Sequence, residues 1–319
     1  MLKSMCRLAL AASLAVAGVA AGAQQYPTKT VRLVAPVEPG SPTDTIARLV
    51  AQRLSVLWGQ QVVVDNRPSV NGVVGSDIVA RAPADGYTLL AGNSGTQVMN
   101  IGLYKKLSYN PVKDFVAISQ VVTSPLVLMG SNHFAPRTVP EVIAGAKSAS
   151  INFAIPGATA QLASLMFDSA AGVDIVSIPY KGSSGAETAL LAGDAQLFFA
   201  SISNALPYVR SGRMKAIAVT SLARTPVLPE TPTLDEAGLK GFELDYWVGL
   251  FAPAALPGPV TEKINGDVMK VLQMKEVRER ILELGYTPAP RQTAAFGQYV
   301  KTSAEKYARL MHDLGIQPQ

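Results

Sequence analysis

The sequence predicts an α/β protein with parallel strands, and three features of the 319-residue chain support this fold class. Short β-branched runs alternate with runs of helical period over most of the length, and the last quarter changes to amphipathic helices. The only cysteine is Cys6, close to the N-terminus, so the rest of the chain cannot depend on a disulfide framework. Alternation of strands and helices is typical of sheets whose parallel strands are joined by crossover helices.

Nine short apolar runs predict strands, because they are rich in β-branched residues and most are bounded by turn-forming residues. They occupy residues 31–35, 61–65, 87–92, 125–130, 151–155, 173–178, 196–200, 215–220 and 246–252. Runs with apolar residues at helical spacing predict helices at residues 43–57, 72–82, 160–171, 185–192 and 203–210. Two amphipathic helices are predicted after the last strand, at residues 259–284 and 292–314.

The first 23 residues have the pattern of a secretory signal peptide. Lys3 and Arg7 precede an apolar run over residues 8–19, and an A-x-A cleavage site ends at Ala23. The run is shorter than the roughly 20 residues that a membrane-spanning helix needs. We therefore expect cleavage near Ala23 and export, rather than a membrane anchor. Cys6 precedes the apolar run, whereas a lipoprotein cysteine would follow it.

Two stretches read as connections between lobes, one at residues 121–125 and one at 225–243. The second contains three prolines and is too polar and broken for a core element. We therefore predict one lobe from residues 24–123 and 246–319, and a second lobe from residues 124–245.

Composition argues against several classes of function. Without residues 1–23 the chain has 26 Lys and Arg against 23 Asp and Glu, a net charge of +3 with the signs interspersed. A nucleic-acid-binding protein usually shows a clustered basic stripe, so no such partner is expected. Two isolated histidines, His133 and His312, make no metal site, and no cofactor motif occurs. No catalytic acid, base or nucleophile stands out, which favours binding over catalysis.

Small residues follow the first predicted strand, where a helix is expected to begin. Pro39 and Gly40 lead to Ser41, which fits the N-cap, and Pro42 fits the first helical position. Asp44 lies three residues after the cap, as in a capping box. Such a segment can serve simply to start a helix. Alternatively, its uncovered backbone amides and the helix dipole favour binding of an anion. Asp44 would compete with a ligand for these amides.

Four other strand ends carry comparable segments. In open α/β sheets, ligands bind beyond the carboxyl ends of the strands. The repetition therefore predicts a cleft between the lobes, walled by helix N-termini and suited to a carboxylate. Thr159 fits a helix cap, Asn93 to Thr96 fits either a surface turn or a binding loop, and Lys181 is either simply exposed or placed to meet a carboxylate. The segments are Asn93-Ser94-Gly95-Thr96, Gly157-Ala158-Thr159-Ala160, Tyr180-Lys181-Gly182 and Ser201-Ile202-Ser203-Asn204.

The chain resembles the periplasmic substrate-binding receptors of tripartite tricarboxylate transporters, also called Bug-type receptors. Blocks along the whole chain carry the resemblance, notably ADGYTLL (84–90), LYKKLSYNPVKDF (103–115) and IPYKG (178–182). The family implies a two-lobed periplasmic binding protein fold of type II, the Venus flytrap. It also implies location in the periplasm, a small carboxylate bound between the lobes without catalysis, and delivery to a membrane permease of one large and one small subunit. We expect a monomer without cofactor or metal.

The resemblance assigns binding residues in this chain. It implies a first binding loop from Pro39 to Asp44, which includes Thr43, and a second from Gly157 to Ala160. Further contacts are implied from Asn93–Thr96, Tyr180–Gly182 and Ala200–Ser201. Trp247, after the second crossover, either lines the cleft or packs in the core.

Three departures from the family pattern bear on the ligand. The first loop reads EPGSPTD instead of PPGGSTD, so Pro42 removes an amide donor and Glu38 adds a charge near the mouth. The second loop, IPGATAQ, has few hydroxyls. Ala200 stands where many members carry an aspartate that can pair with a ligand ammonium. These departures favour an aromatic or aliphatic carboxylate over an amino acid or a tricarboxylate.

Two other functions remain open at the level of the sequence. A sensing co-receptor for a membrane signalling protein would use the same closed form as a transport receptor. An α/β enzyme acting on a carboxylate would need a single catalytic carboxylate hidden in this pattern.

Overall fold

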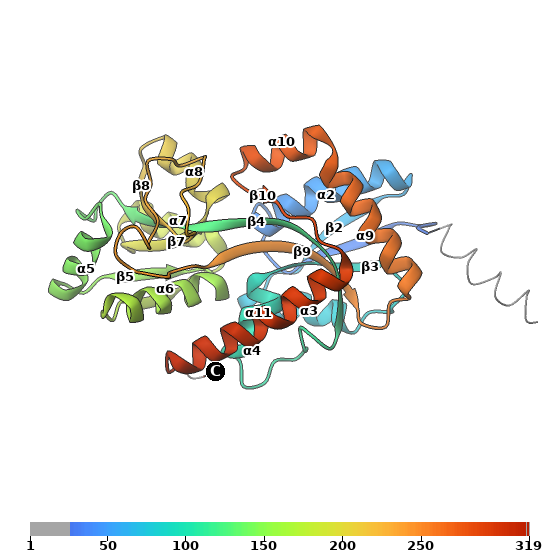
Figure 1. Cartoon of the computed structure of the whole chain (residues 1–319), viewed down its shortest axis with the longest axis horizontal. Coiled ribbons are helices and arrows are strands. Elements are labelled where there is room, and N and C mark those ends of the chain that lie inside the picture. Colours follow the sequence, from blue (N-terminus) through green and yellow to red (C-terminus); the bar gives the residue numbers. More distant parts are fainter. Residues whose placement is uncertain (1–25, 317, 319) are drawn as a thin grey trace, which may run out of the picture.

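The computed structural model describes residues 26–316 and 318, and shows a two-lobed α/β protein (Figure 1). The signal peptide predicted for residues 1–23 lies outside the described residues. In the first lobe, the strand order is β2-β1-β3-β9-β4, with β2, β1 and β3 parallel and β9 antiparallel to both neighbours. The bounds are β1 (Val31–Ala35), β2 (Val62–Asn66), β3 (Thr88–Asn93), β4 (Phe115–Ser131) and β9 (Asp245–Pro253).

The second lobe continues from the far half of β4. There the order is β4-β7-β5-β6, with β5 parallel to both β6 and β7, while β8 also pairs with β4. The two-residue β10 pairs with β4 on the first-lobe side. The bounds are β5 (Asn152–Ile155), β6 (Val176–Pro179), β7 (Leu197–Ser201), β8 (Met214–Val219) and β10 (Thr287–Pro288).

Two long strands carry the chain between the lobes (Figure 1). Residues Phe115 to Pro125 of β4 pair with β9, and Leu126 to Ser131 pair with β7 and β8. The connection predicted at residues 121–125 is therefore the middle of a strand, and the strand predicted at 125–130 is only its second half. Most residues of the first half are buried, which fits a central strand rather than a loop.

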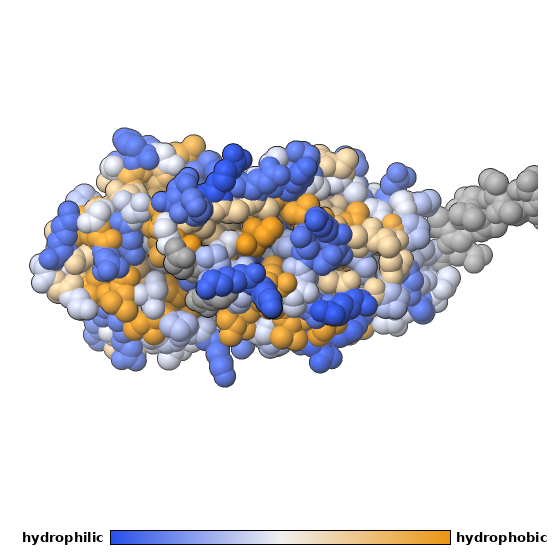
Figure 2. All heavy atoms as spheres, turned by 90° about the horizontal axis from the view of Figure 1, so that it is seen from below, coloured by the Kyte–Doolittle hydropathy of each residue, from blue (hydrophilic) through white to orange (hydrophobic). Residues whose placement is uncertain are grey.

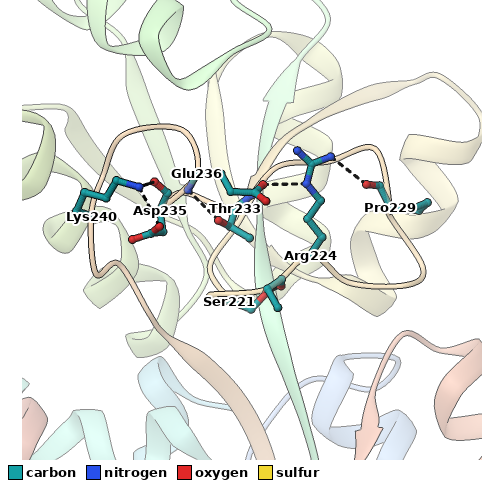
Figure 3. A network of polar contacts seen from close by, with 8 residues as sticks. Ser221, Arg224, Pro229, Thr233, Asp235, Glu236 and Lys240 are labelled. Atoms are coloured by element: carbon teal, nitrogen blue, oxygen red, sulfur yellow. Dashed lines mark hydrogen bonds and ion pairs between the residues drawn. The ribbon is translucent and has the colours of Figure 1, made fainter.

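The segment at residues 225–243, predicted as a connection too polar and broken for a core element, packs against the second lobe. Leu234 and Phe242 are buried, and Phe242 stacks on Phe199 of β7. The polar side chains bond within the segment (Figure 3). Thr233 and Glu236 cap each other's backbone amides at 3.0 and 2.9 Å, as in a capping box. Arg224 pairs with Glu236, and Lys240 with Asp235. Irregular backbone is stable here because its polar groups are paired locally.

Helices cover both sheets, and most predicted ones are present. The helix predicted at residues 259–284 is two helices, because Met274 takes an extended conformation with ψ 131°. Two helices, α4 and α5, escaped the sequence analysis, although Thr138 and Glu141 form the capping box of α5. The helices are α2 (Pro42–Trp58), α3 (Val73–Ala80), α4 (Asn100–Leu103), α5 (Val139–Ser148), α6 (Ala158–Ala171), α7 (Gly182–Ala192), α8 (Ile202–Arg210), α9 (Gly258–Gln273), α10 (Lys275–Glu283) and α11 (Thr293–Asp313), with a 3-10 turn η1 (Val70–Gly72) and a π-helical turn η2 (Gly95–Met99).

The surface is mixed in character. Figure 2 shows hydrophilic and hydrophobic residues interspersed over one face of both lobes. Within the part of the chain that the structure describes, no helix is both long and apolar enough to cross a bilayer.

Candidate functional site

The helix that follows β1 begins with an open turn. Gly40 takes a positive φ of 77°, Ser41 is the N-cap and α2 begins at Pro42. The predicted capping box between Ser41 and Asp44 is not formed, because Asp44 instead bonds the residue before the N-cap. The Asp44 carboxylate accepts a hydrogen bond from the Gly40 amide at 2.8 Å, but the Ser41 hydroxyl makes no cap bond and has no partner among the described residues.

The charge of Asp44 is compensated within its own lobe. Its carboxylate accepts hydrogen bonds from Arg48 at 2.9 Å and from Asn66 at 2.8 Å. Burial alone would raise the pKa of this carboxyl, but the hydrogen bonds from Arg48, Gly40 and Asn66 lower the pKa below its usual value. The Asp44 carboxylate is therefore satisfied by the Gly40 amide and by the positive charge of Arg48. The first amides of α2, which lack intrahelical acceptors, are left for another anion.

Three buried side chains meet beside this helix start. The Asn93 amide donates to the Thr43 hydroxyl at 2.9 Å, and the same hydroxyl lies 2.5 Å from the Tyr246 hydroxyl. Thr43 is 1% exposed and Tyr246 is 9% exposed. Burial raises the pKa of Tyr246, so it remains a neutral hydroxyl over the physiological pH range. Thr43, Asn93 and Tyr246 therefore form a hydrogen-bonded group of polar side chains that is shielded from solvent.

The second lobe meets the first at the next strand end. Ser94 and Thr159 lie within hydrogen-bond distance, at 3.2 Å between hydroxyl oxygens, although 65 residues separate them in the chain. The surface-turn alternative for residues 93–96 is wrong, because Ser94 is fully buried and leads directly into η2. Thr159 is not the cap of α6. Gly157 is the N-cap, and Thr159, inside the helix, turns its hydroxyl toward Ser94.

A third helix start faces the first lobe. The Tyr286 hydroxyl lies 2.7 Å from that of Ser203, which is 3.1 Å from that of Ser201, the N-cap of α8. Burial raises the pKa of Tyr246, and the nearby Tyr286 hydroxyl raises it further. The N-termini of α2, α6 and α8 therefore converge on one region, and the two lobes are closed on each other there.

Two of the predicted residues, Tyr180 and Lys181, belong to a different surface feature. Tyr180 and the exposed Lys181 line a shallow hollow of about 380 Å³ along α7, together with Ser184, Thr188 and Asp194. No hydrogen bond found among the described residues joins them to Thr43 or Asn93. Pro39 and Gly40 are exposed before the start of α2, whereas Ala158, Ala160 and Ala200 are buried at strand or helix ends.

Trp247 packs in the core of the first lobe and does not line the cleft. Its ring lies 5.5 Å from Phe296 and 6.2 Å from Phe251 between centroids, and only 2% of the residue is exposed. Neighbouring residues of a strand point to opposite faces. Because Trp247 faces the aromatic core, its neighbour Tyr246 faces the opposite side of the strand, where Thr43 lies.

The sequence analysis missed two site residues. Tyr246 was adjacent to the predicted Trp247, but the pattern of an almost wholly buried strand does not tell which face meets the site. Tyr286 follows Gly285 in a short connection to β10, and no sequence signal marks it. Only the folded chain brings either tyrosine to the helix N-termini.

One carboxylate near the C-terminal end of α6 gives a pH-dependent prediction. Asp168 lies on α6, and its Oδ1 is buried without a partner among the residues described. Burial raises the pKa of this carboxyl to about 7, with a smaller contribution from Asp174, against the lowering effect of the Ile175 amide. The folded state therefore binds the Asp168 proton more tightly than the unfolded state does. The stability that this carboxyl group contributes is fully present below its unfolded pKa of 3.8 and is lost as the pH rises through about 7.

Asp168→Asn is therefore expected to raise the melting temperature more at pH 8 than at pH 5. The buried carboxyl group destabilises the fold most when it is ionised, and asparagine carries no charge at either pH. Thermal unfolding at the two pH values measures the difference. Asp194→Asn changes an exposed carboxylate on the same lobe and serves as the control. Equal effects of Asp168→Asn at both pH values would refute the prediction.

The fold and the converging strand ends define the class. A two-lobed α/β protein crossed by two long strands, with helix N-termini facing one another, is a periplasmic solute-binding protein. The family described as "Tripartite tricarboxylate transporter family receptor" matches residues 46–316, and the chain belongs to this family. It is a solute-binding receptor and not an enzyme. In the described ranges, no cluster of His, Cys, Asp or Glu is placed to hold a metal ion.

Solved structures of relatives agree with this assignment. Rpa4515 of R. palustris with adipate is 30% identical, with a TM-score of 0.89, covering 92% of this chain and all of that structure. The periplasmic binding protein BugD is 34% identical, with a TM-score of 0.87 and coverage of 92% and 100%. MatC from Rhodopseudomonas palustris with bound malate is 32% identical, with a TM-score of 0.85 and coverage of 89% and 99%. The chain spans nearly the whole of each.

Proposed function

We propose that this protein is a periplasmic receptor that binds a small carboxylate between its lobes and delivers it to a tripartite tricarboxylate-type permease. One observation carries the proposal. Helix N-termini and buried hydroxyls of both lobes face each other across the contact between Ser94 and Thr159. Two relatives support the ligand class, since their structures hold adipate and malate.

Binding in this proposal is shared between the lobes. A carboxylate takes hydrogen bonds from the first amides of α2 and α6, where the helix dipoles favour negative charge. The hydroxyls of Thr43 and Tyr246 lie beside α2, and Thr159 lies in the first turn of α6. Only the closed form offers both sets of donors, so the ligand stabilises closure. The permease then recognises the closed receptor, which acts as an exported monomer in the periplasm.

The residues around the helix N-termini also bear on the chemistry of the part of the ligand beyond its carboxylate. Ala200 at the end of β7 has no charge to offer an ammonium group, and it is 2% exposed. Thr43, Asn93 and Tyr246 are all neutral. A ligand with an uncharged, partly apolar body attached to its carboxylate therefore fits this region better than an amino acid.

A ligand screen tests the proposal. Native mass spectrometry of the purified protein is expected to show a retained small acid, and a thermal-shift panel of mono-, di- and aromatic carboxylates is expected to contain at least one stabilising compound. A ligand at a hundred times its dissociation constant adds about 2.7 kcal/mol of stability. The corresponding primary amides are matched controls and should not stabilise. Stabilisation by the amides, or by no acid in the panel, would contradict the proposal.

A further inference from the structure

The two long strands that cross between the lobes separate at one point. Strands β4 and β9 pair through the first lobe, and the last residues that they pair are Pro125 and Asp245. Beyond this pair, Leu126 pairs with β7 instead, and Leu244 belongs to the chain that arrives from the second lobe. We call these four residues the fork. A rotation of one lobe against the other must bend the chain here, because the fork lies between the two sheets (Figure 1).

The pairing between the two strands is weak at the fork. Pro125 has no backbone N–H, so β4 donates no hydrogen bond from this position. The Pro125 carbonyl accepts a hydrogen bond from the Ser124 hydroxyl at 2.8 Å, within the same strand. The last pair of the ladder therefore holds β4 and β9 together less firmly than the pairs before it.

One residue of the second lobe bonds both strands just beyond this weak pair. Thr220 follows β8 and is fully buried. Its amide donates to the Leu126 carbonyl at 2.9 Å, and the Leu126 amide donates to the Thr220 hydroxyl at 2.8 Å. The same hydroxyl donates to the Leu244 carbonyl at 2.6 Å, and the Leu244 amide donates to the Thr220 carbonyl at 3.2 Å. The hydroxyl therefore accepts from one crossing chain and donates to the other.

The Thr220 hydroxyl is the only part of this arrangement that depends on the side chain. A hydroxyl can donate one hydrogen bond and accept others, so it can join an amide to a carbonyl, whereas a methyl group can do neither. Leu126 is 3% exposed and Leu244 is 0% exposed, so bulk water does not reach their backbone groups in this form. Loss of the hydroxyl would leave the Leu126 amide and the Leu244 carbonyl without this partner.

We propose that Thr220 is a positioning residue that fixes the directions of both crossing chains at the fork, and thereby sets the pivot about which the lobes close. The inference rests on the proposed function, because closure serves binding only when a ligand lies between the lobes. The second lobe turns together with Thr220, and bending is confined to the fork. Tyr246 lies two residues beyond Leu244, so the fork also sets where the Tyr246 hydroxyl meets Thr43.

Spin labels on the two lobes measure this role directly. Cys6 is the only cysteine, so Cys6→Ser with Lys113→Cys and Lys147→Cys leaves one exposed thiol on each lobe. Distances between the labels are measured by pulsed electron paramagnetic resonance, without a carboxylate and with adipate or malate. Thr220→Val should broaden the distance distribution in both states. It should also weaken the binding of these acids by about fivefold, because the bound form must then order the fork.

Two variants separate positioning from simple stability. Thr220→Ser keeps the hydroxyl and should restore the native distances and affinity. Thr261→Val removes a hydroxyl that is also buried, at 4% exposure, but that bonds only the Pro257 carbonyl near its own helix start, at 3.3 Å. It should leave both measurements unchanged. If Thr220→Val does not fold, Thr220→Ala removes the hydroxyl without placing a methyl group against the two backbone groups, and should broaden the distribution in the same way.

Two outcomes overturn the inference. In the first, Thr220→Val lowers the melting temperature but keeps the native distances and affinity, which shows that the hydroxyl contributes only to stability. In the second, Thr220→Ser behaves like Thr220→Val, so that the effect does not follow the hydroxyl. Failure of adipate and malate to bind the native protein would count against the proposed function, whereas the distances measured without a carboxylate would still decide the role of Thr220.

Discussion

Gly285→Ala is expected to hold the two lobes apart and to weaken carboxylate binding by a factor of ten or more. Gly285 takes a φ of 81°, in the left-handed region that costs an L-residue about 1 kcal/mol. An added methyl group would overlap Cγ2 of Ile202 and would lie 3.3 Å from Leu206. Both of these residues lie on α8 of the second lobe, whereas Gly285 precedes β10 of the first. Overpacking of this kind typically costs about 1–3 kcal/mol, and here it acts directly against closure.

A matched variant separates the overlap from the backbone strain. Gly241 has a similar φ of 72°, but no atom lies within 4 Å of the position of an added methyl group. Small-angle scattering at saturating ligand should show a larger radius of gyration for Gly285→Ala than for Gly241→Ala. Equal compactness and equal affinity in the two variants would show that the contact between Gly285 and Ile202 does not control closure.

Thr43→Val is expected to cause the largest loss of binding among substitutions that keep the shape of the site. Valine fills the same space but removes the hydroxyl that bonds both Asn93 and Tyr246. A buried donor or acceptor left without a partner costs about 1–3 kcal/mol. We therefore expect a comparable loss in the free energy of unfolding, and about tenfold weaker binding of the best carboxylate.

Denaturant unfolding and calorimetry measure these two effects. Thr45→Val, two residues along the same helix, removes a hydroxyl for which no bond is found among the described residues and is the matched control. Tyr246→Phe removes one partner only, and a double-mutant cycle with Thr43→Val should give a coupling energy of about 0.5–3 kcal/mol. If Thr43→Val behaves like Thr45→Val in both measurements, the hydroxyl cluster has no role in binding.

Local chemistry made much of the fold predictable. The start of α2 at Pro42 follows from the order of Gly40, Ser41 and Pro42, because each residue type fits its position in a helix start. Strands such as β1 and β7 were found because their apolar runs are short and end at turn residues. The continuous β4 was only half found, since an almost wholly buried strand shows no alternation that would mark its beginning.

The contacts that make the site are not local, and this limits sequence reasoning. The Ser94 and Thr159 hydroxyls meet across 65 residues, and the Thr43 and Tyr246 hydroxyls across 203. A sequence pattern can place each residue at a strand or helix end, but it does not set the closure of one lobe on the other. The choice of Trp247 over Tyr246 shows the same limit, because a change of one residue reverses the face of a strand.

The crystal structure of the complex with the tightest-binding carboxylate tests the central claim most directly. The claim predicts closed lobes, with Ser94 next to Thr159, and ligand carboxylate oxygens that accept hydrogen bonds from the first amides of both α2 and α6. A carboxylate held by one lobe alone, with the lobes apart, or bound instead in the hollow beside Lys181, would contradict it.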